Sequence, residues 1–470
     1  ADPETPCGIV GAQSPSPFGG YDYARLMRKV RFIEAYDLGG AHSIIRSFNP
    51  GNAMPVVTTL FHVFDPKHPQ RADDDIWQLW YYLAHGNSGI IGWVDETWFD
   101  AGSGAPRAWH ETMAPHCLEA GRTIGPLVRG AQWMHDGVAI YYSHASIQLG
   151  WILDAEAHGN TWWNRKGDHR IGASHCVRRA WEDMLRDEGL QYNFISYADV
   201  IQNGVDEQYR VLILPAVPCL SDVEAQRIRA FCKAGGMVIA DYMPGLWDQH
   251  GRGRKKGGAL DGLFHADHDP GLRSDQVFQE RLWTEVDQEA RYDYTTNEEF
   301  LGMDNTCVMH ESGFHKAVRD MDTEYVNAFG KGSAVLMNLS PQMYNAYRER
   351  GAGEAKKRET FMKHLHHAGL ERWVEVESER GEAFGYTITY WKRDDRIVLF
   401  LVFHPEMAEK PAGQGGIKGL KTAKIKIRLK FTSKISQVRN ERTRETPPSS
   451  DFYEIEWKMN EAIVISFAAR

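Results

Sequence analysis

Carboxylates stand beside aromatic residues at two points of the sequence, each directly after an apolar run. Glu34 begins the segment EAYD, and Glu96 lies within WVDETWFD. Cleavage of a glycosidic bond needs two carboxyl groups: one protonates the leaving oxygen, and the other attacks the anomeric carbon or activates water. Apolar surroundings raise the pKa of a carboxyl group, which suits the acid of such a pair. Glu34 and Glu96 are therefore the candidate catalytic residues.

Other polar and aromatic residues near the same apolar runs are candidates for substrate binding. Polar side chains bind sugar hydroxyls, and flat aromatic faces pack against the apolar face of a pyranose ring. The candidates are Gln13, Tyr36, Asp37, Arg46, His62, Trp93, Asp95 and Trp98, with Trp162 or Trp163 as further stacking residues. The alternative is structural: Trp residues fill cores, and Glu34 or Glu96 caps a helix or pairs with Arg46.

The first 130 residues alternate short apolar runs with amphipathic stretches, which is typical of consecutive βα units. The predicted strands are Gly8–Gln13, Arg31–Tyr36, Met54–Phe61 and Ser88–Val94, and the predicted helices are Tyr23–Val30, Ala41–Ser47, Asp74–His85 and a long one from Glu111 to Gly130. A complete (β/α) barrel has eight units and catalytic groups at the carboxyl ends of its strands. Four units leave two open edges. The pattern therefore predicts half of a barrel, whose other half lies on a missing amino-terminal segment or on a partner chain.

Residues 134–370 are predicted to form a flavodoxin-like doubly wound domain. Its strands are Val138–Tyr142, Tyr192–Ser196, Val211–Pro215, Gly236–Asp241 and a single strand within Tyr325–Leu339; its helices are His175–Glu188, Asp222–Ala234 and Glu354–Ala368. Ser221 and Asp222 are helix-capping candidates, and Gly235 and Gly236 mark a helix end. A loop rich in Trp and His is expected after Tyr142, and a long loop from Gly245 to Pro270.

Residues 371–470 change to a period of two. Seven short runs alternate apolar and polar residues, among them FGYTITYW, AKIKIRLKF and AIVISFA. Such runs, separated by turn residues, predict a β-sandwich. The chain is thus predicted to be α/β with three domains: 1–130, 134–370 and 371–470.

The bulk composition excludes several classes of function. The formal net charge is −9, which argues against nucleic acid or an anionic membrane as partner. The basic run Arg252–Lys256 stands among glycines and is predicted to be a solvated loop. No run of about 18 apolar residues is present, and the six cysteines are scattered without metal-ligand spacing, so we expect free thiols. His364, His366 and His367 are assigned to a helix surface. No cofactor and no metal are predicted.

Two longer segments resemble a known family. The stretch AHGNSGIIGWVDETWFDAGSGAPRAWHETMAPH resembles the last βα unit of family 42 glycoside hydrolases, which are retaining β-galactosidases. The segments VAIYYS and VLILPAVPCLSDVEAQRIRAFCKAGGMVIADY look like the trimerisation domain of that family, and the end of the chain looks like its accessory β-domain. The resemblance implies a β-galactosidase-like hydrolase, a glycoside or oligosaccharide substrate and a homotrimer.

The sequence departs from the family at the catalytic pair. The family's acid/base glutamate would precede residue 1, and its nucleophile belongs on the strand MPVVTTLFH, where Thr58, Thr59 and His62 stand instead. Two interpretations remain. The chain takes part in glycoside hydrolysis through Glu34, Glu96 or the missing half, or it is a non-catalytic carbohydrate-binding or assembly subunit with a degenerate barrel.

The family's trimerisation domain has a flavodoxin or glutamine-amidotransferase-like fold, so the resemblance of residues 134–370 to it raises a third possibility, a cysteine-dependent amidotransferase. Cys219 follows a strand in the segment PAVPCL. It lacks the flanking glycines of a nucleophile elbow, and no His/Glu pair stands behind it at helical spacing. The domain is therefore predicted to be structural or to contribute a wall to a neighbouring subunit's cleft.

Overall fold

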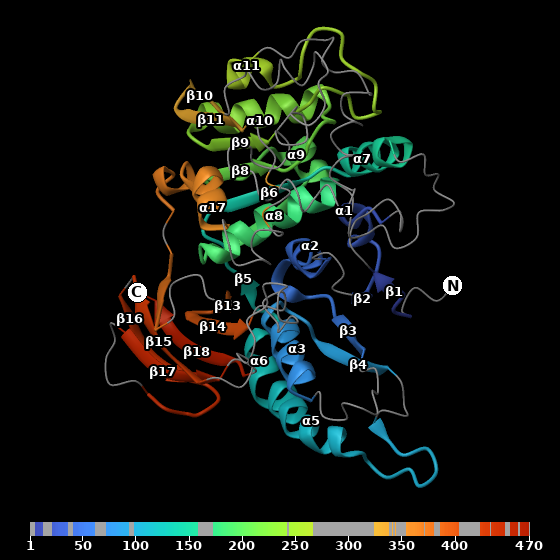
Figure 1. The fold of residues 1–470 in the computed structure, drawn as a ribbon, viewed down its shortest axis with the longest axis vertical. Helices are drawn as coiled ribbons and strands as arrows, with labels where there is room; N and C mark the ends of the chain where they lie inside the picture. Colours follow the sequence, from blue (N-terminus) through green and yellow to red (C-terminus); the bar gives the residue numbers. More distant parts are fainter. Residues whose placement is uncertain are drawn as a thin grey trace.

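A computed structural model describes most of the chain. The residues described are 5–12, 21–35, 41–61, 72–93, 98–157, 173–241, 244–266, 324–337, 341, 344, 354–370, 372–379, 386–403, 424–432, 434–446, 452–458 and 461–469. In this part of the chain no helix is long and apolar enough to cross a membrane. The described elements gather into three regions, each built on its own sheet or pair of sheets (Figure 1).

The first region is a sheet of four parallel strands in sequential order. The strands are β1 (Gly8–Ala12), β2 (Phe32–Ala35), β3 (Val56–Phe61) and β4 (Gly89–Trp93). The helices that follow them are α1 (Tyr23–Leu26), α2 (Ala41–Ser47), α3 (Ala72–Ala84), α5 (Ala108–Glu119) and α6 (Gly125–Val128), with a short 3-10 turn at Pro50–Asn52. The strand bounds agree with the predicted ones to within two residues.

Alternate residues of this sheet point to its two faces. Ile33, Ala35 and Val56 are buried against α1 and α2. On the opposite face Val10 is 64% exposed and Ile91 is 37% exposed. Parallel sheets are normally covered on both faces, because their crossover helices lie there. The helices of this region thus cover one face of the sheet, here called the outer face, and leave apolar side chains on the inner face.

One predicted helix is interrupted. Instead of a single helix from Glu111 to Gly130, α5 passes into a π-helical turn at Ala120–Ile124 and then into α6. Pro126 has no backbone N–H, so the Arg122 carbonyl lacks its usual donor four residues on, and the Gly125 N–H closes the π turn on the Ala120 carbonyl. The sequence pattern marked the apolar face of this stretch but not its change of helix type.

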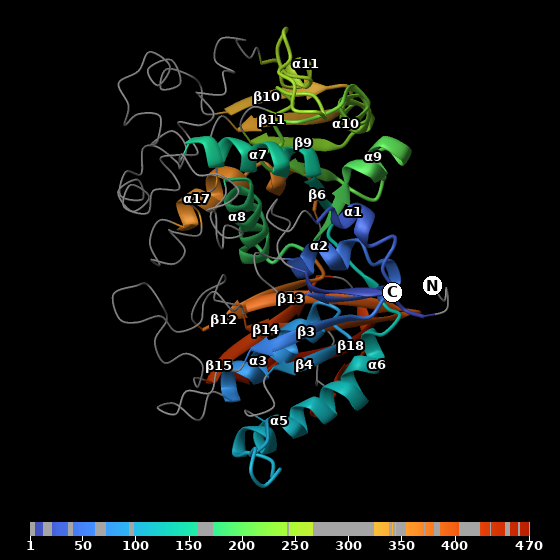
Figure 2. The ribbon, with the colours of Figure 1, turned by 90° about the vertical axis from the view of Figure 1, so that its right-hand side faces the viewer.

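The second region is a six-stranded sheet in the order β10-β11-β9-β8-β6-β7, parallel except for the edge strand β10. The strands are β6 (Val138–Tyr142), β7 (Tyr192–Ser196), β8 (Val211–Leu214), β9 (Met237–Asp241), β10 (Glu324–Phe329) and β11 (Gly332–Met337). One face packs on α8 (Ala173–Asp187) and α17 (Glu354–Met362), and the other on α9 (Tyr197–Asn203), α10 (Asp222–Ala234) and α11 (Asp261–Phe264). Figure 2 shows helices on both sides of this sheet.

Two predictions for this region are wrong. The loop expected after β6 is instead the helix α7 (His144–Ala157) in its described part. Its apolar residues surround the helix rather than forming one stripe, so no helical period was visible. The single strand expected within Tyr325–Leu339 is a hairpin of β10 and β11. Gly330 has a φ of +65°, and a Cβ there would lie 2.7 Å from Lys233, so the turn requires glycine.

The third region is the predicted sandwich of two antiparallel sheets. One sheet has the order β12-β15-β17 and the other β16-β18-β14-β13-β5. The strands are β12 (Val374–Ser378), β13 (Tyr386–Arg393), β14 (Arg396–Phe403), β15 (Lys424–Phe431), β16 (Ile435–Asn440), β17 (Phe452–Lys458), β18 (Ile463–Ala469) and the two-residue β5 (Gln132–Trp133). All seven predicted strands are present. Strand β5 was not predicted, and it ties the sandwich to the segment before β6.

Candidate active site

Glu34 lies on the inner face of the four-stranded sheet. It stands in register with Val57 of β3, and the hydroxyl of Thr59 donates a hydrogen bond to its carboxylate. The carboxyl group is nearly enclosed, with 2% of the residue exposed. A buried carboxylate needs hydrogen-bond donors because its charge is poorly solvated. Thr59 therefore fixes the orientation of Glu34 near the carboxyl end of β2, the end where barrel enzymes place catalytic groups.

Thr58, next to Thr59, points to the outer face. Its hydroxyl bonds to His42 Nε2 on α2 at 2.7 Å and accepts a hydrogen bond from the Asn87 side chain. The His42 ring stacks on Tyr82 of α3 with ring centroids 4.9 Å apart. The two threonines thus serve different faces, because successive side chains of a strand alternate. No sequence pattern predicted the His42 contact, because it depends on how α2 packs.

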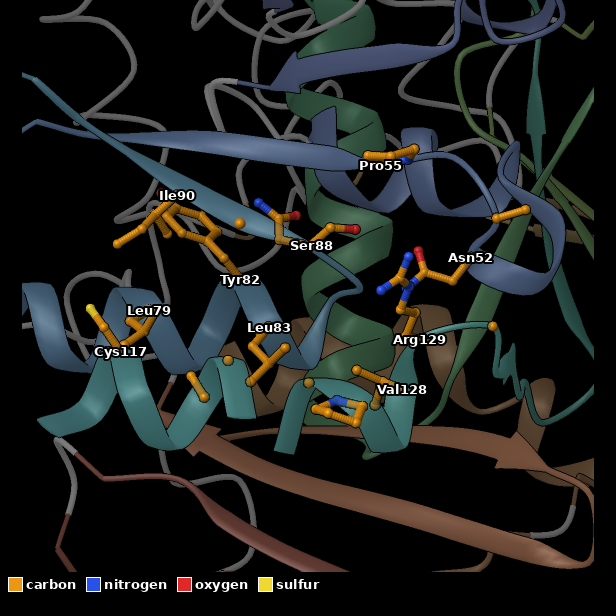
Figure 3. Close-up of a pocket in the computed structure, with 18 of the residues that line it drawn as sticks. Asn52, Pro55, Leu79, Tyr82, Leu83, Ser88, Ile90, Cys117, Val128 and Arg129 are labelled. Atoms are coloured by element: carbon orange, nitrogen blue, oxygen red, sulfur yellow. The ribbon is translucent and has the colours of Figure 1, made fainter. Parts of the chain in front are cut away.

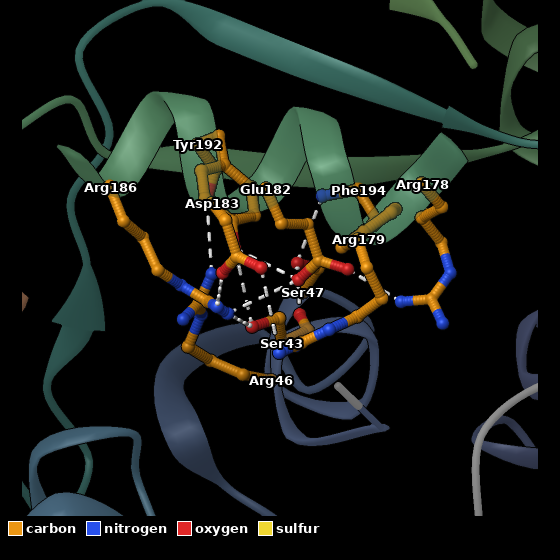
Figure 4. A network of polar contacts seen from close by, with 10 residues as sticks. All are labelled: Ser43, Arg46, Ser47, Arg178, Arg179, Glu182, Asp183, Arg186, Tyr192 and Phe194. Carbon is orange, nitrogen blue, oxygen red and sulfur yellow. Dashed lines mark hydrogen bonds and ion pairs between the residues drawn. The ribbon is translucent and has the colours of Figure 1, made fainter. Parts of the chain in front are cut away.

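Arg46 does not share the face of Glu34. Its guanidinium lies 3.4 Å from the centre of the Trp133 ring, and its Nη2 donates to the Tyr192 carbonyl at 3.1 Å. Burial lowers the pKa of Arg46 to about 10. Figure 4 shows Arg46 directed at the polar network of α8. Helix α2 packs against β7, and this side of the helix is therefore an interface rather than part of a cleft.

Trp98 also lies away from Glu34. Its ring covers Gly92 of β4, where an added Cβ would approach the ring to 2.3 Å. It packs with the side chains of α3 and α5, and its ring centre lies 6.1 Å from that of His110. Gly92 faces the helices because its neighbour Ile91 faces inward. The structure therefore places Trp98 on the outer face of the sheet and not beside a sugar bound to Glu34.

The remaining predicted site residues are not available for comparison. Gln13, Tyr36, Asp37, His62, Asp95, Glu96, Trp162 and Trp163 lie outside the described residues. Trp93 is described only as the last backbone position of β4. Of the two candidate catalytic residues, Glu34 is the one that the structure places.

A cavity of about 800 Å³ lies at the other end of the four-stranded sheet. It opens between α3 and the stretch from α5 to α6, beside the residues that precede β3 and β4 (Figure 3). Leu79, Leu83, Ile90 and Val128 form its apolar lining, and Arg129 lies at its rim. Because it adjoins the amino ends of the strands, it is not where a barrel would perform chemistry.

Cys219 is not an activated nucleophile. The residue is buried, and burial raises the pKa of its thiol to about 12. Only the thiolate is strongly nucleophilic, and its population is negligible at neutral pH with such a pKa. The backbone N–H of Cys219 donates to the Ser146 hydroxyl at 3.0 Å, so the segment serves to close the carboxyl end of the sheet.

Comparison with known proteins confirms the resemblance predicted from the sequence. Residues 138–268 match the family model of the β-galactosidase trimerisation domain. A segment of 168 residues is 26% identical to the β-galactosidase BbgII of Bifidobacterium bifidum. The fold is similar to that of a catalytic mutant of Gan42B, a GH42 β-galactosidase from G. stearothermophilus, with a TM-score of 0.60 and 14% identity. It is also similar to the β-galactosidase from Bacillus circulans sp. alkalophilus, with a TM-score of 0.61 and 13% identity.

These similarities extend over different shares of the proteins. The fold match covers 100% of this chain and 64% of the Gan42B chain, and 99% of this chain and 64% of the Bacillus enzyme. The match to BbgII covers 33% of this chain and 22% of that protein. The chain is thus similar to family 42 glycoside hydrolases along its length and spans about two thirds of their solved structures.

Proposed function

We propose that the chain belongs to a glycoside hydrolase that cleaves β-linked, galactoside-like substrates with retention. Residues 1–130 would be the last four βα units of a (β/α)8 barrel, residues 134–370 a trimerisation domain and residues 371–470 an accessory sandwich. The family resemblance supports the reaction class and a homotrimer. Four parallel strands in sequential order, with helices on one face, support the assignment to a barrel.

The placement of Glu34 carries the proposal. Retaining glycosidases need two carboxyl groups about 5–5.5 Å apart. The buried Glu34 carboxylate, held by Thr59 on the inner face, is suited to be one of them. Glu34 supplies one of them, and Glu96 or a carboxylate from the rest of the barrel supplies the second. Gln13, Tyr36, Asp37, His62, Trp93 and Asp95 would bind the sugar around this pair.

The exposed inner face indicates where the rest of the barrel docks. Val10 and Ile91 leave apolar surface on this face, and β1 and β4 are the open edges of the sheet. Open edges and uncovered parallel sheets are unfavourable in water. Further strands, from a longer form of the chain or from a partner, would pair with these edges and cover Val10 and Ile91.

Replacement of Glu34 by Gln in the full-length protein tests the proposal. The variant keeps the volume and one acceptor for Thr59 but cannot act as acid, base or nucleophile, so we expect kcat on aryl β-galactosides to fall by at least about 100-fold. Glu441→Gln is the matched control, because Glu441 is also buried and accepts a hydrogen bond from a hydroxyl, that of Ser466. Full activity of a folded E34Q protein contradicts the assignment.

A non-catalytic sugar-binding subunit is the second candidate function. The observation that favours it is the pair Thr58 and Thr59. These two residues stand on the strand where the family carries its nucleophile, and their hydroxyls are occupied by hydrogen bonds, Thr58 with His42 and Thr59 with the Glu34 carboxylate. This function predicts galactoside binding, measured by calorimetry, without turnover by the full-length protein. Under it, E34Q would alter affinity alone. Measurable hydrolysis that is lost in E34Q decides against it.

A further inference from the structure

The basic run Arg252–Lys256 lies in a loop that is fixed at both of its ends. The backbone N–H of Arg254 donates to the Leu246 carbonyl at 2.9 Å, and that of Ala259 donates to the Gly245 carbonyl at 2.9 Å. The loop therefore starts and ends on the segment that follows β9. Side chains of like charge repel one another, and a run of them usually lies on a loop without fixed contacts. Here, by contrast, backbone hydrogen bonds hold the like charges close together.

The loop borders a hollow of about 690 Å³ whose lining carries more positive than negative side chains. Arg252, Arg254, Lys255 and Lys256 contribute four positive charges, and Asp222 and Asp248 contribute two negative ones. Arg254 is neutralised by Asp222 at 2.7 Å. Within the described residues, neither lysine forms an ion pair. Lys255 and Lys256 thus add positive charge that the surrounding side chains leave uncompensated.

The backbone of the same loop offers further donors. In the described part of the chain, the N–H groups of Lys255, Lys256 and Gly257 have no hydrogen-bond acceptor. Gly257 has a φ of +96°, which turns the chain sharply at this point. Successive N–H groups in such a turn form a concave site for anions, and adjacent ammonium groups strengthen it.

We propose that this hollow binds a sulfate or phosphate group, either as the free ion or carried on a small saccharide. Tetrahedral oxyanions accept several hydrogen bonds at once, which matches two lysines and three amides on one loop. A long polyanion is a poor occupant, because the net charge of −9 repels it from the rest of the surface. The site is separate from Glu34 and does not depend on hydrolysis.

Isothermal titration calorimetry on the full-length protein tests the site. The probes are inorganic sulfate, inorganic phosphate and galactose 6-sulfate, at constant ionic strength set with sodium chloride. We expect the double variant K255A/K256A to bind all three at least about tenfold more weakly, because it loses both ammonium donors of the loop. The control K392A/K434A removes two exposed lysines from the sandwich and the same total charge, and should bind as the parent does.

The outcomes separate the source of the anion from an effect of charge alone. Equal affinity for sulfate and galactose 6-sulfate identifies the free group as the ligand, and tighter binding of the sugar sulfate, with none of galactose, identifies a saccharide. Either result requires the loss in K255A/K256A. The proposal is overturned if chloride competes fully with every probe, or if the control loses as much affinity as the loop variant.

Discussion

Asp136 is the buried carboxylate whose charge the fold disfavours most clearly. It lies between β5 and β6, where the Gln191 backbone N–H donates to its Oδ2 at 2.6 Å, and its Oδ1 has no partner among the described residues. Burial raises the pKa of Asp136 to about 7, although the Gln191 hydrogen bond and Arg372 act in the opposite direction. The donor to Asp136 is thus a backbone N–H, whereas the donor to Glu34 is the Thr59 side chain.

Replacement of Asp136 by Asn should stabilise the protein above neutral pH. A carboxyl group with a raised folded-state pKa contributes most stability at low pH, and this contribution is lost as the pH rises from the unfolded value towards 7. The full difference is on the order of 4 kcal/mol. Melting curves from pH 4 to 8 measure it, with the exposed Asp395→Asn as control. A gain that is constant with pH would argue against ionisation as its cause.

Helix α8, predicted as His175–Glu188 and observed as Ala173–Asp187, has charged residues whose burial only the structure reveals. The segment RRAWEDMLRDE carries charges at helical spacing, a pattern usually found on a solvent-exposed face. The structure buries it: Glu182 accepts from Arg178 at 2.5 Å and from the Tyr192 hydroxyl at 2.9 Å, and lies 3.3 Å from Arg186 (Figure 4). Arg186 also donates to Ser43 of α2 at 3.1 Å. The network joins the first region to the second.

Glu182→Gln should therefore destabilise the protein by about 3 kcal/mol, because it removes a negative charge that is shared by two buried guanidinium groups, those of Arg178 and Arg186. Denaturation by urea, followed by tryptophan fluorescence, reports the loss, since Trp181 lies on the same helix. The exposed Glu111→Gln on α5 is the control and should be neutral within about 0.5 kcal/mol. A neutral E182Q would mean that the network is not a source of stability.

At the scale of the whole molecule, Glu188 connects three parts of the chain. It follows α8, binds Arg358 of α17 at 2.9 Å and lies 3.0 Å from Arg372, the residue before the sandwich. Burial alone would raise the pKa of Glu188, but Arg358 and Arg372 outweigh it and the pKa is lowered. The contacts keep the sandwich against the six-stranded region.

Glu188→Gln should have the opposite pH dependence to D136N. A depressed carboxyl pKa contributes stability above the unfolded value of 4.5, and the contribution is lost as the pH falls through the folded value. We expect a loss of about 2 kcal/mol at pH 7 that shrinks below pH ~4.5. Scanning calorimetry of parent and variant across this range measures it. A loss that persists at low pH would assign the effect to packing instead.

Local patterns in the sequence determined most of the elements and the order of the three regions. Apolar residues at period two fixed the sandwich strands. Ser221, a predicted cap, is the N-cap of α10, and the structure adds Glu224 as its partner in a capping box. The same patterns identified Glu34 as a residue at a strand end. These features depend on neighbours within a few residues, since burial of one face imposes the period and a cap satisfies N–H groups of its own helix.

Only the tertiary structure decided which side chains meet. Glu34 of β2 contacts Thr59 of β3, and Arg46 and α8 lie in an interface between two regions. Trp98 lies on the outer face of the four-stranded sheet, and β5 pairs with a sandwich strand over 250 residues away in sequence. Such contacts depend on the rotation and register of elements packed from distant segments, and a one-residue shift of register would exchange the two faces of a strand. The sequence of one segment does not contain that information.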